Sequence, residues 1–506
     1  MVFEPVYETL KAEGLTPAIK AQAVVEAQLT PPEGVEIKQI LSVSAVSAVS
    51  AAEVFAGEAR YNGRVDFTAL YVDTAGAVGV METRAEFSDK IAAGGIGPKT
   101  DAFFCSSVLD VDASKCTERE FSPACVVEVM LFCSLQTDVH CLTECTGDVF
   151  RKEDKASLLT KVASGRQNFE VSVTHSDSAI EKLLTVNCAL CYKGADISEG
   201  VIEAEGEIVL SYIGLAGGVL VEENAREPFR REIEAGEAAR GDMAAVFLQT
   251  EDVGTRGISE DGVQTYETTL NIGADFAVFS VRERDIVADL FSLSVDVLAE
   301  RQTETVCENV SSVVFGETIS GNVTLDIGNA PVDNVLCFAA RKANVTNCYA
   351  GKGVVTAEGI VSGCVVYFSE DIGKICSVNV ELPFSVTKSA DVNGGENVFL
   401  SACVTSHSIR VRRANELNIK AEVCFFGTAL KSAACPYISS VTENGEKSEN
   451  SAALTVHLAA KGEGIWEVAK SAGCPPDDIM RQNPALTLPL QGGERILIYR
   501  SVKEKF

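Results

Sequence analysis

One motif recurs three times along the chain and keeps the same phase. It consists of two glycines six positions apart, GEARYNG, GVIEAEG and GVVTAEG, followed by a strand-like segment that contains a tyrosine. The first glycines are Gly57, Gly200 and Gly353, so the motif recurs after 143 and then 153 residues. One such pair would carry no information, but a regular recurrence indicates repeated structural units.

Two further markers hold register with these glycines. A phenylalanine, Phe87, Phe229 or Phe384, follows each second glycine by 23 to 25 residues. An apolar signature precedes each first glycine by 20 or 21 residues: Ile37, Ile40 and Leu41; Ile180, Leu183 and Leu184; Val332, Val335 and Leu336. The three markers predict three tandem repeats of about 150 residues. We expect the glycines to allow positive φ or a bulge, because no helix N-terminus follows them to cradle a ligand.

Apolar residues alternate with polar ones within each unit. Two segments show the pattern clearly, with Val65, Phe67, Ala69 and Tyr71 on one face of the first and Leu417, Ile419, Ala421, Val423 and Phe425 on one face of the second. A period of two with one buried face is typical of antiparallel sheets. The sequence therefore predicts a mainly β fold, in which three β-sandwich or barrel-like repeats precede a small C-terminal domain.

Composition excludes some partners. The 506 residues carry a net charge of −29, so nucleic acid and anionic lipid surfaces are not expected to bind. The N-terminal sequence MVFEPVYETLKAEG lacks the apolar core of a signal peptide, and the longest apolar-leaning run, residues 40–52, is too short and serine-rich for membrane insertion. A protein that stays in the compartment of its synthesis is expected, with its 17 cysteines as reduced, small hydrophobic residues.

No constellation predicts catalysis, a cofactor or a metal. The closest approach to a metal cluster is His140 with Cys133, Cys141 and Cys145, and the pair Cys188 and Cys191 has zinc-like spacing. Both lie in strand-like runs without a matching second pair, so we expect a non-enzyme without metal. A metal-dependent enzyme that uses His140 and the nearby cysteines remains the third hypothesis, and elemental analysis would test it.

A compact unit with a different pattern occupies the C-terminal end. A strand at 454–458 and the turn KGEG precede a helix whose apolar face contains Ile465, Val468, Ala469 and Ala472 and which ends at Gly473. A second helix begins in CPPDD and stops at Pro484, and a strand follows at 495–499. The only tryptophan, Trp466, lies beside the first helix face and is expected to be a core residue more often than a ligand platform.

This unit resembles the LysM domain. The matching residues are Val456, Leu458, Gly462, Glu463, Gly464, Ile465, Trp466, Ala469, Asp478, Ile479, Asn483, Pro484, Leu490, Gly492, Ile496 and Ile498. The resemblance implies a binding groove for N-acetylglucosamine oligomers formed by Gly462, Glu463, Gly464 and Ile465 with Asn483, Pro484, Ala485 and Leu486. Family members usually carry Gly-Asp-Thr where this chain has Gly462-Glu463-Gly464, and a closing proline where it has Tyr499.

Three repeats followed by one LysM-like unit resemble the SipL family of spore-coat morphogenetic proteins. The resemblance implies a non-catalytic scaffold in the mother-cell cytoplasm, located at the forespore surface and spore coat, whose LysM domain binds a SpoIVA-like coat ATPase. Self-association of the repeats by strand addition is also expected. The alternative is a cell-envelope protein that binds peptidoglycan or N-acetylglucosamine oligomers, and sedimentation with peptidoglycan would separate the two.

The expected domain organisation follows from these patterns. An N-terminal segment occupies residues 1–30, and the β-rich repeats occupy 31–160, 170–310 and 320–438. A polar stretch at 439–452 is expected to be a linker, since it contains few apolar residues, and the LysM-like domain spans 453–501.

Overall fold

The structure is a computed structural model that describes residues 3–117, 119–260, 262–326, 328–413, 415–447 and 454–499. Most of these residues lie in β-strands, and two short helices occur near the C-terminal end of the described chain. The mainly β fold predicted from the alternating pattern is therefore confirmed. Neither helix is long and apolar enough to span a lipid bilayer.

Residues 3–147, the first segment, form two sheets. Its strands are β1 (Phe3–Leu15), β2 (Ile19–Glu26), β3 (Ile37–Phe55), β4 (Glu58–Asp73), β5 (Val78–Ala92), β6 (Ala102–Asp112) and β7 (Ala124–Gly147). One sheet is the antiparallel meander β3-β4-β5, and in the other β7 pairs with β1, β2 and β6. β1 and β2 thus pair with β7, whereas the sequence predicted a separate N-terminal segment at 1–30. Their side chains alternate between buried and exposed, so they extend the same sheet.

The second and third segments repeat this order of pairing. Residues 150–291 contain β8 (Phe150–His175), β9 (Lys182–Ser198), β10 (Val201–Ala216), β11 (Val219–Glu234), β12 (Met243–Glu260) and β13 (Val263–Phe291). Residues 295–446 contain β14 (Val295–Thr324), β15 (Asn334–Gly351), β16 (Val354–Ser369), β17 (Lys374–Ser389), β18 (Asn397–Arg413) and β19 (Glu416–Glu446). In each of these two segments a meander of the second, third and fourth strands forms one sheet, and the first, fifth and sixth strands form the other.

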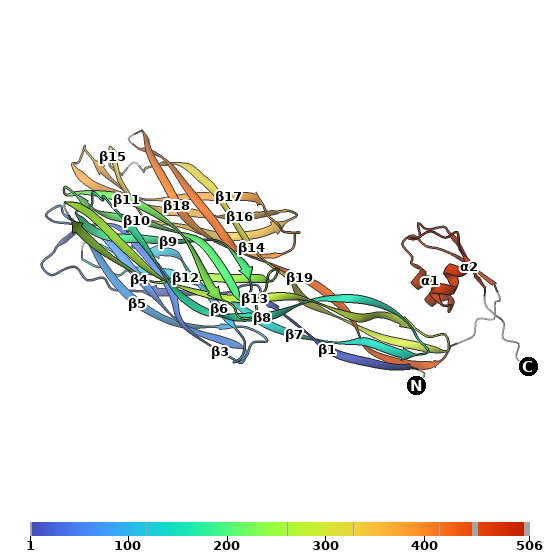
Figure 1. Ribbon diagram of the computed structural model, residues 1–506. Helices are drawn as coiled ribbons and strands as arrows, with labels where there is room; N and C mark the ends of the chain where they lie inside the picture. The colour runs from blue at the N-terminus through green and yellow to red at the C-terminus, as the bar shows by residue number, and fades with distance from the viewer. Residues whose placement is uncertain are drawn as a thin grey trace, which may run out of the picture.

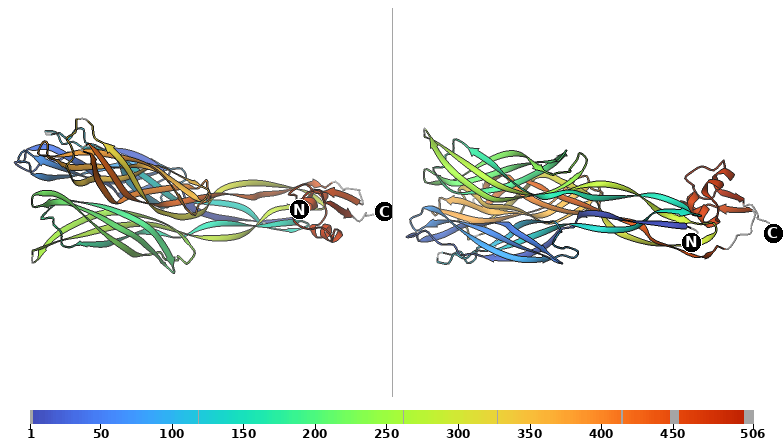
Figure 2. Two further views of the ribbon diagram at one scale, coloured as in Figure 1. Left: turned by 90° about the horizontal axis from the view of Figure 1, so that it is seen from above. Right: turned by 60° about the horizontal axis from the view of Figure 1, so that its bottom comes forward.

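The two sheets of each segment face each other around a core. In the first segment Phe67 on β4 and Val127 on β7 belong to the same buried cluster. The faces predicted from alternation point inward: Val65, Phe67 and Ala69 are buried, as are Leu417, Ile419 and Phe425. We call the three two-layer sandwiches the heads, and Figures 1 and 2 show them side by side at one end of the molecule.

The two glycines of the recurring motif have different structural roles. The first of each pair lies in a hairpin turn with φ of +79° at Gly57, +74° at Gly200 and +72° at Gly353, as expected. The second has no positive φ and instead lies directly across the ladder from the marker phenylalanine, in the pairs Gly63–Phe87, Gly206–Phe229 and Gly359–Phe384. A Cβ at each of these glycines would lie 2.3 to 2.6 Å from the phenylalanine ring. The ring therefore occupies the space of the missing side chain.

The first and last strands of each segment continue beyond the heads as three two-stranded ribbons, which together form the stalk. The ribbons pair Phe3–Leu15 with 134–147, 150–159 with 281–291, and 295–310 with 430–446. Figures 1 and 2 show them running together away from the heads. Their inner side chains share cores: Leu10, Leu158 and Cys435, one from each ribbon, belong to one buried cluster. The stalk core is thus shared by all three segments.

A small unit lies at the far end of the stalk. It consists of β20 (Leu454–Leu458), α1 (Ile465–Ala472), α2 (Pro476–Gln482) and β21 (Arg495–Tyr499). The predicted order of strand, helix, helix, strand is confirmed, with α1 closed by Gly473 at a φ of +61°. β19 extends to Glu446, so residues 439–446 are strand where a linker was expected, because they pair with β14. The rest of the expected linker, 448–452, and the ends of the expected domain, 453 and 500–501, lie outside the described residues.

Candidate functional site

The terminal unit packs on the end of one ribbon. Phe150 and Phe291 are register partners at the ends of β8 and β13, and their rings stack with centroids 5.2 Å apart. The Trp466 ring meets Phe291 edge to face at 5.1 Å, and Phe291 belongs to the same buried cluster as Val468 and Ile479 of the helices. The only tryptophan is therefore a half-buried contact between the unit and the stalk, neither a pure core residue nor a free ligand platform.

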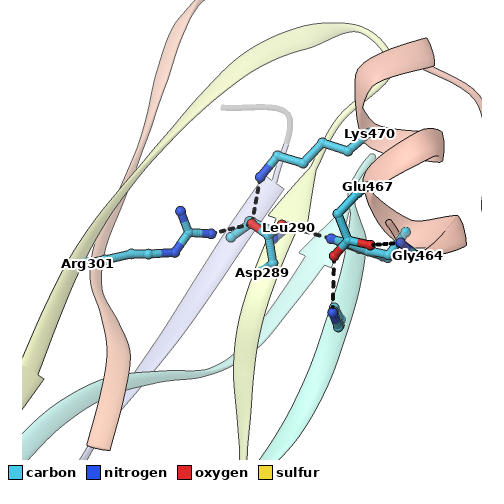
Figure 3. Close-up of polar contacts among 8 residues, drawn as sticks. Asp289, Leu290, Arg301, Gly464, Glu467 and Lys470 are labelled. Carbon is cyan, nitrogen blue, oxygen red and sulfur yellow. Dashed lines mark hydrogen bonds and ion pairs between the residues drawn. The ribbon is translucent and has the colours of Figure 1, made fainter. Parts of the chain in front are cut away.

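The Asp289 carboxylate is the main polar contact between α1 and the stalk (Figure 3). Asp289 on β13 accepts a hydrogen bond from Trp466 Nε1 at 2.8 Å and another from Lys470 Nζ at 2.6 Å. Arg301 on β14 donates to the same carboxylate at 2.5 Å, so two ribbons and the helix meet here. Burial acts to raise the pKa of Asp289, but the hydrogen bonds from Lys470 and Trp466 outweigh it and hold the pKa below its ordinary value.

A second polar contact lies one turn back along α1. The Glu467 carboxylate accepts a hydrogen bond from Lys152 Nζ of β8 at 3.3 Å and another from the backbone N–H of Gly464 at 3.0 Å. The carboxylate therefore caps the first turn of α1 and binds the stalk at the same time. Together with Asp289, this contact fixes the face of α1 that carries Lys470 against the ribbon end (Figure 3).

The predicted groove residues before α1 form a tight, internally bonded turn. Gly462 has a φ of +81°, which requires a glycine-like conformation. Glu463 accepts hydrogen bonds from His457 Nε2 at 2.9 Å and from the N–H of Ala460 at 2.8 Å. The His457 bond is the main influence that lowers the pKa of Glu463. Ile465 is half-buried against the core of the unit.

The predicted groove residues after α2 divide into structural and exposed ones. The Asn483 side chain donates to the carbonyls of Ile479 at 2.8 Å and Leu497 at 2.7 Å, and accepts from the N–H of Leu497 at 2.8 Å. It thus joins the end of α2 to β21. Pro484 and Ala485 are exposed, whereas Leu486 is half-buried against the core.

The outer face of the small sheet is apolar and exposed. Leu454, Val456 and Leu458 alternate along β20 and are 50%, 55% and 64% exposed, and Tyr499, which pairs with Leu454, is 52% exposed. The opposite face carries Ile496 and Ile498, which are fully buried under the helices. The solvent-exposed face of a strand usually carries polar side chains. An exposed face with apolar side chains is therefore a candidate contact surface.

A cavity of about 1100 Å³ lies where the three heads meet, lined by residues of β3, β9 and β15 among others. Several of its charged groups are engaged with protein partners: Arg84 binds Asp66 at 2.5 Å, and Lys342 donates to the carbonyl of Leu109 at 2.8 Å. Arg341 binds Glu222, both nearly buried. The Lys342 and Arg341 contacts join the third head to the first and to the second.

The residues considered for a metal cluster are separated. The His140 ring stacks on Tyr7 at 5.6 Å and approaches the Thr9 hydroxyl at 3.1 Å. Cys141 and Cys145 lie in two cores of the stalk, and Cys133 lies in the first head. Among the residues described here, no group of three or more histidine, cysteine, aspartate or glutamate side chains is arranged to hold a metal ion.

Sequence reasoning placed the terminal unit but missed what holds it. Asp289 lies 177 positions from Trp466, and nothing in its neighbourhood, DIVADLF, distinguishes it from other exposed acids on strands. The apolar pattern of LTVHL was visible, yet alternation alone does not tell which face the helices cover. No protein family, curated protein or solved structure matches the chain.

Proposed function

We propose that the protein is a non-catalytic assembly scaffold, in which three copies of one β-domain form the body and a LysM-like unit at the stalk end binds a protein partner. By its resemblance to the SipL family, the partner is a SpoIVA-like coat ATPase and the location is the forespore surface in the mother cell. The observation that carries the proposal is the position of the terminal unit, held by one face of α1 at the end of a long stalk.

The interpretation as three copies is supported by coincidences that go beyond strand order. Each head has a backbone irregularity in the strand next to its second glycine, between Val49 and Ala51 opposite Gly63, for example. The equivalent irregularities adjoin Gly206 and Gly359. The first glycine, the irregularity and the glycine–phenylalanine pair therefore recur together, which independent folds of similar topology would not require.

The chemistry of the terminal unit favours a protein over a glycan. Glu463 and Asn483 bond to groups of the unit itself, and the Trp466 indole N–H donates to the stalk. These polar and aromatic groups are the kind that a sugar would need. The uncovered surface around the small sheet is largely apolar: Leu458, Val456, Leu488 and Tyr499 are each more than half exposed, and the exposed Arg495 lies opposite Leu458. An apolar surface with a polar rim is typical of a protein contact.

Removal of the unit tests the docking function. A chain that ends at residue 451 is expected to lose co-purification with the coat ATPase and localisation to the forespore. Leu458→Glu is expected to weaken co-purification at least tenfold with the unit still folded, because it places a charge in the exposed apolar face. Leu298→Glu is the matched control, since Leu298 lies on the stalk and is similarly exposed at 61%. Unchanged localisation of the truncated chain would contradict the proposal.

Peptidoglycan binding is the competing outcome. Sedimentation of the intact protein with purified peptidoglycan is expected to leave it in the supernatant. Pelleting that is lost when Gly464→Asp changes the turn, while co-purification with the coat ATPase persists, would favour a cell-envelope role instead.

A further inference from the structure

Three cysteine thiols meet between the second and third heads. Cys403 on β18 and Cys424 on β19 are direct register partners in one sheet. Cys191, on β9 of a different sheet, forms hydrogen bonds with both of their thiols. Cys188 and Cys191 have zinc-like spacing in the sequence, but residues three apart on a strand face opposite sides of the sheet. The Cys188 thiol therefore points away from Cys191 and forms a hydrogen bond with Thr250.

The surroundings of the three thiols are a contact between two heads. β9 touches both β18 and β19. Nearby, Arg226 of the second segment donates to the carbonyl of Thr405 at 2.8 Å, and Phe426 packs against the core that contains Tyr192. Lys193 acts electrostatically on the Cys191 and Cys424 thiols, and it pairs at 3.2 Å with Glu207, the register partner of Cys191. The strands that carry the three thiols are thus held together by contacts other than the thiols themselves.

The three thiols differ in access and in acidity. Cys191 and Cys403 are buried, whereas Cys424 is partly exposed. Hydrogen bonds from Cys191 and then Cys403 hold the pKa of the Cys424 thiol well below its ordinary value. The thiolate is the nucleophilic form of cysteine, so the most reactive thiol of the three is also the one that a small oxidant can reach.

We propose that these thiols form an oxidation site, at which a hydroperoxide such as hydrogen peroxide joins Cys424 to Cys191 in a disulfide. The bond would connect the β11-β10-β9 sheet of the second head with the β14-β19-β18 sheet of the third. It would also tie the third segment covalently to the second. Cys403 supports the site as a hydrogen-bond partner and is not joined.

The chemistry balances with the peroxide as the only added reagent. The Cys424 thiolate attacks one peroxide oxygen, the O–O bond breaks, and a sulfenic acid and hydroxide form. The Cys191 sulfur then attacks the Cys424 sulfur, the S–O bond breaks, and the leaving hydroxide takes the Cys191 proton as water. The hydroxide of the first step takes up the proton that Cys424 lost on ionising. In total two sulfurs are oxidised, the peroxide is reduced, and two waters are released.

The test uses the full chain, reduced and then treated with hydrogen peroxide before alkylation with N-ethylmaleimide in denaturant, which exposes the buried thiols. We expect two of the 17 cysteines to become resistant to alkylation, and peptide mass mapping to join Cys191 with Cys424. Faster migration in a non-reducing gel, reversed by dithiothreitol, should accompany the link, since it closes a long loop. C424S and C191S are expected to lose the link, whereas C403S retains it.

The stalk supplies a matched control. Cys141 and Cys435 are neighbouring buried thiols of one core, and C435S is expected to leave the link unchanged. A map that joins Cys403 with Cys424, or full alkylation of the wild-type protein after peroxide, would overturn the proposal. The mapping on wild-type protein decides the matter even where a variant folds poorly.

Discussion

The heads and the stalk consist of the same strands but distribute their cores differently. Each head encloses a core from its own segment, with Val65 and Val129 in the first and Val361 and Val423 in the third. One further cluster, which includes Leu41, Ile213 and Cys337, joins the three heads to each other. The stalk cores combine residues from all three segments, such as Phe3, Val287 and Ile438. One strand, for instance β7, therefore contributes to a private core at one end and to a common core at the other.

This difference predicts different folding behaviour. A head needs contacts within about 150 residues of chain, whereas the stalk brings together strands from the two ends of the body, β1 and β19. The stalk can form only when all three segments are in place, because no ribbon can bury its apolar face alone. We expect the heads to be semi-independent and the stalk to make the body cooperative.

The largest expected effect comes from Phe132→Ala at the junction of heads and stalk. Phe132 is 1% exposed and contacts Phe247 and Phe399 of the other two segments at centroid distances of 4.7 and 5.2 Å. Removal of this side chain should lower the free energy of unfolding by about 3–5 kcal/mol. Native-state hydrogen exchange should show all three segments loosened.

Phe67→Ala is the matched control for this prediction. Phe67 is equally buried but lies in the core of the first head alone. A comparable loss of stability is expected, with increased exchange concentrated in residues 37–133. Equal loosening of all heads by both variants would contradict the distinction between private and common cores.

A somewhat smaller effect is expected within a single head from Gly206→Ala. A Cβ at Gly206 would lie 2.3 Å from the Phe229 ring and 2.7 Å from the carbonyl of Cys191. Overpacking of this kind costs about 1–3 kcal/mol. Gly254→Ala in β12 should be nearly neutral in thermal denaturation, because its Cβ would meet open space. A neutral Gly206→Ala would show that the ring moves aside freely.

A still smaller effect is expected at the joint between stalk and terminal unit. Asp289→Asn removes the charge that Trp466, Lys470 and Arg301 share, at a cost of about 1 kcal/mol for a partly exposed site. The emission of the only tryptophan should shift to the red while the melting temperature of the body stays the same. Asp285→Asn, on the same strand but exposed, should change neither.

Acid should weaken the same joint without a mutation. The folded pKa of Asp289 is depressed, so its contribution is complete above the ordinary carboxyl pKa of 3.8 and is lost as the pH falls through the lower folded value. A pH titration of Trp466 emission should therefore show a transition below pH 3.8 that Asp289→Asn abolishes. A transition that persists in the variant would assign the effect to another carboxyl.

Much of the local structure could be predicted from particular residues. Val65, Phe67 and Ala69 point inward as their alternation requires, and Gly57, Gly200 and Gly353 take positive φ. The two helices and two strands of residues 454–499 follow from apolar spacing and from Gly473. Seven of the eight groove residues lie in the loops before α1 and after α2, and Ile465 begins α1, but their hydrogen bonds could not be predicted from their order in the sequence.

The sequence by itself determined which residues form strands, where the chain turns and which faces are apolar, since these depend on sterics and periodicity over a few residues. Only the tertiary structure decided that each marker phenylalanine covers a glycine, that three ribbons share one core, and that Asp289 holds the terminal helix. Such contacts join residues tens to hundreds of positions apart, and their formation depends on the relative placement of whole sheets, about which a local pattern carries no information.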